Sequence, residues 1–196
     1  MDDNYTQTVN ISVMIIGDYS VGKTGLLLRF TDNSFPARYG QTIGLDLKVR
    51  TIDIDHFFVK ISCWDSAGGE KFRSFVRNEF RRFDGLILAF DVSRQSTFDS
   101  LPMWINNIED YGPQDLEYVI VGCKIDCESR QIPFNVAKKF ANDRKIQYFE
   151  TSAMEGLGVD DPFIALTRLI LQHKEQYRSN SLLNIKKPKR KNICPC

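Results

Sequence analysis

One octapeptide restricts the fold of this chain more than any other stretch: Gly17-Asp18-Tyr19-Ser20-Val21-Gly22-Lys23-Thr24. It fits the pattern G-x-x-x-x-G-K-[ST], the P-loop, in which glycines let backbone N–H groups curl around a phosphate chain. Residues 9–16 before it form an apolar, β-branched run, and residues 26–30 after it open a helical stretch. A strand, this loop and a helix in that order predict a phosphate site, because the positive helix N-terminus faces the anion. A plain glycine turn would explain the loop but not its two neighbours.

The P-loop pattern assigns roles to individual residues. Lys23 reaches the β- and γ-phosphates, and the hydroxyl of Thr24 holds Mg²⁺. The other residues of this stretch that are predicted to bind the cofactor are Asp18, Tyr19, Ser20, Val21, Gly22 and Gly25.

Apolar runs alternate with helical stretches along the rest of the chain. The predicted strands are 9–16, 45–52, 57–64, 85–90, 118–121 and 146–150. The predicted helices are about 22–32, 97–111, 133–143 and 160–178, with a weak helix within 65–82. Residues 53–56 form the turn of a predicted hairpin. This order predicts an α/β fold with a six-stranded, mostly parallel sheet, one antiparallel edge strand and helices on both faces.

Three details refine the predicted helices. We expect Pro102 to distort the first turns of the 97–111 helix and Pro133 to lie near the start of the next one. The inward face of the last helix carries Phe163, Leu166, Ile170 and Tyr177.

Length and composition indicate one globular domain. The 196 residues are 42% apolar and 26% charged, so we expect a domain at 1–178 and a flexible basic tail at 179–196. No apolar run approaches the length of a membrane span, and the polar segment 1–10 is not a secretory signal. Five dispersed cysteines, an odd number, indicate reduced thiols and a cytosolic protein.

Charge is unevenly distributed along the chain. The net charge is +1, yet five cations lie within six positions: Lys186, Lys187, Lys189, Arg190 and Lys191. Without them 21 basic residues stand against 25 acidic ones, so the body is near −4. The basic cluster is therefore local, and we expect no nucleic-acid-binding surface on the domain.

Further polar residues follow the predicted strands, where ligands of such sheets bind. After the third strand, Asp65 can hold Mg²⁺ and Gly68 lets a backbone N–H approach a γ-phosphate. After the fifth, the Asp126 carboxylate can accept two N–H donors of a guanine edge, which adenine lacks in that arrangement. Residues 151–153 can add a backbone donor to the guanine oxygen, and Thr42 can bind Mg²⁺ when a γ-phosphate is present. Each feature alone is common in loops, and their order behind the P-loop carries the prediction.

With these motifs the chain resembles the Rab family of Ras-superfamily small GTPases over about residues 9–178. The matching motifs are Gly17–Thr24, Thr42-Ile43-Gly44, Trp64-Asp65-Ser66-Ala67-Gly68, Lys124-Ile125-Asp126 and Glu150-Thr151-Ser152-Ala153. The resemblance implies a membrane-traffic switch that binds GTP or GDP with Mg²⁺ and hydrolyses GTP. It implies catalytic roles for Lys23, Thr42 and Gly68, and metal ligands at Thr24, Thr42 and Asp65.

The resemblance also implies nucleotide and partner contacts. Phe35 would stack near the guanine and Tyr39 would cover the phosphates. The residues around the base would be Cys123, Lys124, Asp126, Ser152, Ala153 and Met154. Residues 36–44 and 66–82 would be the two switches. Effectors, exchange factors and GTPase-activating proteins would then bind residues 36–48 and 66–82.

Two departures from the family concern hydrolysis. Gly69 stands where the family has the glutamine that orients the attacking water, and glycine has no side chain for this task. Tyr19 stands where these proteins carry a small residue, and its ring would crowd the γ-phosphate and the path of an arginine finger. Both predict slow hydrolysis and resistance to activating proteins; Glu70 and Arg73 are alternative sources of a water contact.

Other departures concern the base and the partners. Cys123 replaces an asparagine whose amide holds the base and ties its loop to the P-loop, and a thiol bonds weakly. Met154 replaces a lysine, so we expect weaker nucleotide binding or faster exchange, still with guanine selected by Asp126. Glu79 occupies an aromatic position of the second switch, which predicts an altered partner surface.

The chain ends in Ile193-Cys194-Pro195-Cys196. A C-a-a-X box needs a cysteine fourth from the end, so the ending is instead similar to the doubly geranylgeranylated Cys-x-Cys ends of Rab proteins. We expect lipidation at Cys194 and Cys196 by the prenylation machinery, with the protein peripheral on the cytosolic face of an intracellular membrane. Residues 186–191 also fit a nuclear-import hexamer, and this alternative stays open.

Two other functions remain open at this point. One is an adaptor that holds GTP with negligible hydrolysis, which Gly69 and Tyr19 favour. The other is a P-loop phosphotransferase acting on a small molecule, although no arginine-rich lid or substrate-binding insertion is apparent.

Overall fold

Six strands form one sheet in the order β2-β3-β1-β4-β5-β6. The computed structural model describes residues 8–36, 40, 42, 44–55, 57–67 and 77–185. The strands are β1 (Thr8–Gly17), β2 (Leu45–Ile54), β3 (Phe57–Ser66), β4 (Gly85–Asp91), β5 (Glu117–Cys123) and β6 (Tyr148–Thr151). Among the named strands of the described residues, only β2, at the edge, pairs antiparallel with its neighbour, as the hairpin pattern predicts.

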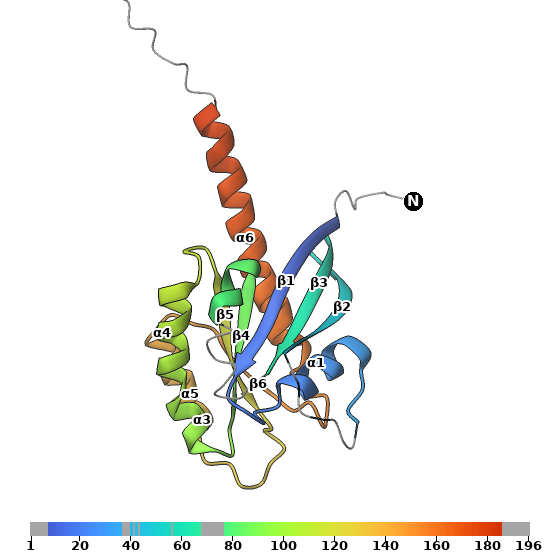
Figure 1. Ribbon diagram of the computed structural model, residues 1–196, viewed down its shortest axis with the longest axis vertical. Coiled ribbons are helices and arrows are strands. Elements are labelled where there is room, and N and C mark those ends of the chain that lie inside the picture. The colour runs from blue at the N-terminus through green and yellow to red at the C-terminus, as the bar shows by residue number, and fades with distance from the viewer. Residues whose placement is uncertain are drawn as a thin grey trace, which may run out of the picture.

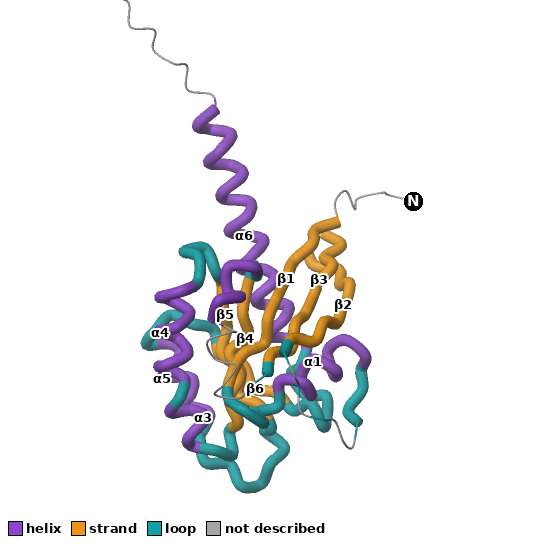
Figure 2. The backbone as a smooth tube through the Cα atoms, in the orientation of Figure 1, coloured by secondary structure: helices purple, strands orange, loops and turns teal. Residues whose placement is uncertain are grey.

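Helices cover both faces of this sheet (Figures 1 and 2). They are α1 (Lys23–Asp32), α3 (Gln95–Asp99), α4 (Leu101–Tyr111), α5 (Phe134–Asn142), α6 (Asp160–Ile185) and a 3₁₀ turn, η2 (Phe80–Arg82). Buried residues of α1 and α6 share one core with the sheet, and those of α4 and α5 share the other. The predicted α/β architecture with two covered faces is therefore confirmed.

The two cores explain why the central strands are apolar throughout. Along β1, Val13 packs into the α1–α6 core and Met14 into the opposite core, and both are at most 1% exposed. Rings of Phe30 in α1 and Phe163 in α6 stack with centroids 3.7 Å apart, which fixes α1 against α6. The P-loop therefore connects two elements, β1 and α1, that are both packed into the core.

The helix predicted at 97–111 is two helices, α3 and α4, separated at Ser100. Pro102 lies in the first turn of α4 and has no N–H to donate back to Phe98, so a continuous helix loses a hydrogen bond there. Pro133 caps α5 in an extended conformation, as its position before the helical pattern predicts.

The last helix ends later than predicted. Phe163, Leu166 and Ile170 are buried as expected, and the side chain of Tyr177 lies outside the described residues. The backbone of α6 continues to Ile185, past the predicted end at Arg178. The reason is that polar composition does not stop a helix; the first proline after α6 is Pro188.

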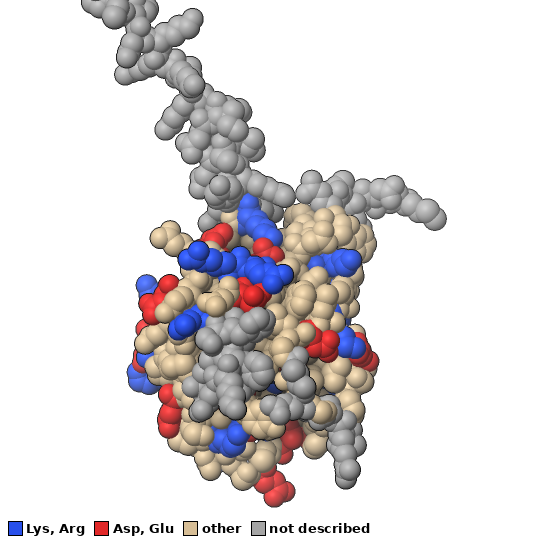
Figure 3. Space-filling model, viewed as in Figure 1, with Lys and Arg blue, Asp and Glu red and all other residues tan. Residues whose placement is uncertain are grey.

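In the segment 65–82, the described residues include the end of β3, a helical turn at 77–79 and η2. Among the described helices, none is both long enough and apolar enough to cross a membrane. On the face drawn in Figure 3, basic and acidic side chains of the described residues are interspersed.

Candidate nucleotide site

The carboxyl ends of the parallel strands bring the predicted site residues to one edge of the sheet. The P-loop follows β1, Asp65 lies at the end of β3, and Cys123 ends β5. Gly17 has φ +138°, and a Cβ there would lie 2.1 Å from the Ala89 carbonyl oxygen, so only glycine fits between the strands. Gly22, with φ +113°, turns the loop into α1.

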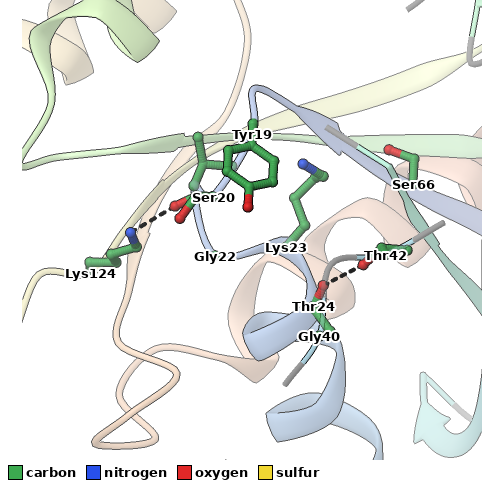
Figure 4. Close-up of a pocket in the computed structure, with 10 residues that line it drawn as sticks. Tyr19, Ser20, Gly22, Lys23, Thr24, Gly40, Thr42, Ser66 and Lys124 are labelled. Atoms are coloured by element: carbon green, nitrogen blue, oxygen red, sulfur yellow. Dashed lines mark hydrogen bonds between the residues drawn. The ribbon is translucent and has the colours of Figure 1, made fainter. Parts of the chain in front are cut away.

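The P-loop encloses a cavity of about 170 Å³ (Figure 4). Its lining is Tyr19, Ser20, Val21, Gly22, Lys23, Thr24, Gly40, Thr42, Ser66 and Lys124. Lys23 is 5% exposed, and its Nζ donates to the carbonyls of Gly17 at 3.0 Å and Asp18 at 2.8 Å. Burial lowers the pKa of Lys23 to about 8, with the nearby carboxylates opposing the shift. An anion in the cavity would therefore favour its charged form.

Three side chains next to this cavity form a candidate metal site. Asp65 Oδ2 accepts hydrogen bonds from the hydroxyls of Thr24 at 2.6 Å and Thr42 at 2.7 Å. Among the described residues, Asp65 Oδ1 is buried and has no hydrogen-bond partner. Burial raises the pKa of Asp65, against the two threonine bonds and the Lys23 charge. Two hydroxyls and a carboxylate with an unused oxygen fit Mg²⁺, which binds hard oxygen ligands together with phosphates.

A second cavity of about 210 Å³ adjoins the first and is more apolar. Its lining is Gly22, Gly25, Leu26, Phe35, Cys123, Lys124, Asp126, Thr151, Ala153 and Met154. Gly22 and Lys124 line both cavities, so one elongated ligand can occupy the two together. A mainly apolar pocket with one carboxylate, Asp126, suits a purine whose edge presents N–H groups.

Comparison with known proteins agrees with this geometry. The model of the Ras family matches residues 12–172. Similar proteins include Ras-related protein Rab-18-B of Danio rerio, 42% identical over 173 residues, 88% of this chain and 83% of the relative. GTP-binding protein YPT1 of Saccharomyces cerevisiae is 35% identical over 178 residues, 90% and 86% of the two chains. Ras-related protein Rab-15 of Mus musculus is 36% identical over 166 residues, 84% and 78%.

This chain is a Rab-family member of the Ras family. It is thus a small GTPase that binds GTP and GDP with Mg²⁺. The predicted base contacts lie in the second cavity with one exception. The exception is Ser152, which is buried and does not line the pocket. Its backbone N–H and C=O form hydrogen bonds with those of Leu157.

The unusual residues of this Rab-family site are placed as follows. Cys123 is 3% exposed, and its Sγ accepts a hydrogen bond from the Thr151 hydroxyl at 3.8 Å. Burial raises the pKa of Cys123 to about 11, so the group is a neutral thiol. Tyr19 is 55% exposed and lines the phosphate cavity together with Ser20 and Lys23, so its ring lies at the mouth of that cavity (Figure 4).

Several predicted residues lie outside the described residues. They are Tyr39, Gly68, Gly69, Glu70, Arg73, Cys194 and Cys196. Gly40, Thr42 and Gly44 are the described members of the first predicted switch beyond Pro36.

Sequence reasoning missed three charged residues that hold the site together. Asp91 is 1% exposed at the end of β4 and binds both Arg94 and Lys124. Arg29 of α1 donates from Nε to the Ala153 carbonyl at 2.7 Å and from Nη2 to the Met154 carbonyl at 2.9 Å. Asp91 could have been found from the sequence, because it is an acidic residue at the end of a wholly apolar strand. Arg29 and Arg94 could not, because their sequence neighbourhoods are those of ordinary surface cations.

Proposed function

We propose that this chain is a slow GTPase switch of membrane traffic that works from a lipid-anchored position on a cytosolic membrane face. As a Rab-family protein it is a guanine-nucleotide switch in membrane traffic. The observation that most supports the assignment of its site is the pair of adjoining cavities that share Gly22 and Lys124. One cavity carries the phosphate-binding loop, and the other carries the carboxylate that would select guanine.

The reaction is an in-line attack of water on the γ-phosphate. Lys23 and the P-loop N–H groups would stabilise the charge that develops on the phosphate oxygens. Mg²⁺, when bound by Thr24, Thr42 and Asp65, would neutralise phosphate charge. No side chain at position 69 can orient the water, and the Tyr19 ring stands at the cavity mouth. These two features support slow turnover and poor access for an arginine finger.

The surface at the two predicted switches would bind a different set of partner proteins from those of other Rab proteins. The exposed side chains of Leu47 (42%) and Val49 (45%) lie on β2, and Leu47 is paired across the hairpin with Trp64. Glu79 is tied to Arg82 by an ion pair. The Glu79 side chain is 16% exposed and that of Arg82 is 69% exposed, so this ion pair, in place of an aromatic ring, would be what a partner meets there. Effectors and regulators would therefore contact a surface at residues 36–48 and 66–82 that combines apolar side chains with an ion pair, and Val49 extends its apolar part by one position.

The tail is proposed to anchor the domain of residues 1–178. Two isoprenoid chains on Cys194 and Cys196 would each contribute about 0.8 kcal/mol per buried CH₂. The five cations at 186–191 would add roughly 1 kcal/mol each near an anionic leaflet. Mass spectrometry of membrane-bound protein from its native cell tests this. Two unmodified thiols on that fraction would contradict the anchor, and nuclear accumulation would favour the import alternative.

The central test is to identify the nucleotide that remains bound after purification from cells without added nucleotide. We expect GDP or GTP at close to one per chain, displaced by GTP but not by ATP in the presence of magnesium. Asp126→Ala should lose this preference, whereas Asp115→Ala, which removes an exposed carboxylate that lines neither site cavity, should retain it. Equal competition by ATP against the wild type would contradict guanine selection and favour a phosphotransferase.

A further inference from the structure

We propose that Arg94 is a positioning residue for the phosphate-binding loop. With Lys124 it shares one buried carboxylate, Asp91, and the two cations hold successive carbonyl groups of the loop. The loop amides are thereby turned toward the phosphates. This inference rests on the proposed nucleotide site and adds a residue to which the P-loop motif gives no role.

Asp91 is the buried carboxylate that holds Arg94 and Lys124 in place. Its Oδ1 accepts hydrogen bonds from the backbone N–H of Ser93 at 2.9 Å and the Ser93 hydroxyl at 2.6 Å. Its Oδ2 accepts from Arg94 Nε at 3.1 Å and Lys124 Nζ at 2.7 Å. Burial pushes the pKa of Asp91 upward, but the bonds from Lys124 and Ser93 outweigh burial and hold it below its usual range. Asp91 is therefore an anion whose two oxygens have fixed partners.

The two cations reach adjacent peptide units of the loop. Arg94 Nη2 donates to the Tyr19 carbonyl at 2.8 Å, across 75 positions of sequence. Lys124 Nζ donates to the Ser20 carbonyl at 2.7 Å, across 104 positions (Figure 4). In a trans peptide the C=O and the following N–H point in opposite directions. Holding the Tyr19 and Ser20 carbonyls on the outside therefore turns the next two N–H groups, of Ser20 and Val21, inward.

The loop needs such support because of its own backbone. Ser20 has φ +60°, a left-handed conformation that costs energy for any residue with a side chain. Cys123, moreover, offers a thiol where an amide would reach across to the loop, and its Sγ bonds with Thr151 instead. The connection from β4 through Arg94 is therefore a main link between the sheet and the loop residues that the phosphates contact.

Arg94 can be replaced without leaving a buried charge unpaired. Asp91 keeps Lys124 and both Ser93 bonds, so no buried ion is left unpaired and the fold should persist. The Arg94 side chain is 40% exposed, so its loss opens no cavity in either core. An effect on nucleotide binding would then report the loop geometry.

The experiment measures release of N-methylanthraniloyl-GDP from full-length protein in magnesium buffer after addition of excess GDP. We expect Arg94→Ala to release it about tenfold faster, the cost of one charge-assisted hydrogen bond, and Arg94→Lys to lie between. The matched control is Arg168→Ala, which removes an exposed arginine paired with Asp55 at the hairpin turn. This control should release the nucleotide at the wild-type rate.

Thermal unfolding with and without GDP separates positioning from general stability. We expect Arg94→Ala to unfold near the control temperature without nucleotide and to gain less from GDP than the wild type. Release within twofold of the Arg168→Ala control would overturn the proposal. A lower nucleotide-free unfolding temperature with an unchanged gain from GDP would also overturn it. A wild type that takes up no guanine nucleotide would overturn both this inference and the proposed function. This outcome differs from failure of the Arg94 proposal alone, because it is seen in the wild type without any variant.

Discussion

The hydroxyls of Thr24 and Thr42 lie 3.0 Å apart, although one belongs to α1 and the other to the segment between α1 and β2. Both contact the same oxygen of Asp65. The first predicted switch is thus connected to the P-loop helix at the place where a magnesium ion would bind. This contact makes the position of Thr42 sensitive to whatever occupies the metal site.

Thr42→Ala should reduce the preference for GTP over GDP. Thr42 would reach Mg²⁺ only when a γ-phosphate holds its segment closed, so its hydroxyl would stabilise the triphosphate complex alone. We expect GTP-analogue affinity to fall about tenfold while GDP affinity stays within about twofold, measured by calorimetry with magnesium. Thr42→Ser keeps the hydroxyl and should behave like the wild type. Equal losses for both nucleotides would show that Thr42 serves the fold and not the switch.

Cys123→Asn should slow nucleotide release. An amide can supply the one or two hydrogen bonds that the thiol lacks, roughly 1–3 kcal/mol or a tenfold to hundredfold slower release. The measurement is GDP dissociation after chase. Cys63→Ala, a buried thiol of β3 outside both site cavities, is the control and should not change the rate. Identical rates for Cys123→Asn and the wild type would count against the assignment of Cys123 to the base loop.

The strands and the phosphate loop could be predicted because they depend on local patterns. Apolar runs, the hairpin alternation and the glycine spacing each act within about ten residues. The sequence predicts that Pro102 distorts a helix, and Pro102 divides that helix into α3 and α4 because its missing N–H falls at the start of a turn. The end of α6 cannot be predicted in this way, because a polar segment without proline or glycine carries no stop signal.

The supports of the site could not be predicted in the same way. Arg94 meets Tyr19, and Arg29 meets Ala153, across 75 and 124 positions of sequence. Both hydrogen bonds are accepted by backbone carbonyls. Because every residue has a backbone carbonyl, the identity of the accepting residue does not predict the bond. Such contacts follow from the packing of helices against the sheet, and only the assembled fold reveals them.

Arg29→Ala should loosen the loop behind the guanine. This arginine holds the carbonyls of Ala153 and Met154, and a third bond from Nη1 reaches the Asn33 carbonyl at 3.1 Å. We expect about tenfold faster GDP release and weaker preference for GTP over ITP, which lacks the exocyclic amine. Lys139→Ala removes an exposed cation of α5 and serves as control. Faster release with unchanged base preference would mean that Arg29 acts on the Asn33 side alone.

Among the three described cysteines, Cys127 should react first with iodoacetamide. Hydrogen bonds involving Ser129 lower the pKa of Cys127, whereas burial raises the pKa of Cys63 and Cys123 to about 12 and 11. The reactive species is the thiolate, so raising the pH from 6.5 to 8.5 should accelerate labelling of Cys127 and leave the buried pair unlabelled. Peptide mapping by mass spectrometry follows each site separately. Ser129→Ala should raise the pKa of Cys127 and slow its reaction at neutral pH.

Gly69→Gln should accelerate GTP hydrolysis, and adding Tyr19→Ser should accelerate it further. Gly69 lies outside the described residues, so this expectation rests on the family pattern, in which a glutamine orients the attacking water. Restoring a positioning group should raise the single-turnover rate on the order of 10²-fold. Tyr19→Ser removes the ring from the mouth of the phosphate cavity, which Tyr19 and Lys23 both line (Figure 4).

The comparison between Tyr19→Ser and Tyr19→Phe separates bulk from chemistry at this position. If the ring merely obstructs water, Tyr19→Phe should be as slow as the wild type and Tyr19→Ser faster. If the phenol hydroxyl itself helps to hold the water, Tyr19→Phe should be slower than the wild type. A wild type that already hydrolyses GTP rapidly, with no gain from glutamine at position 69, would show that another residue orients the water. Glu70 and Arg73 would then be the first positions to replace.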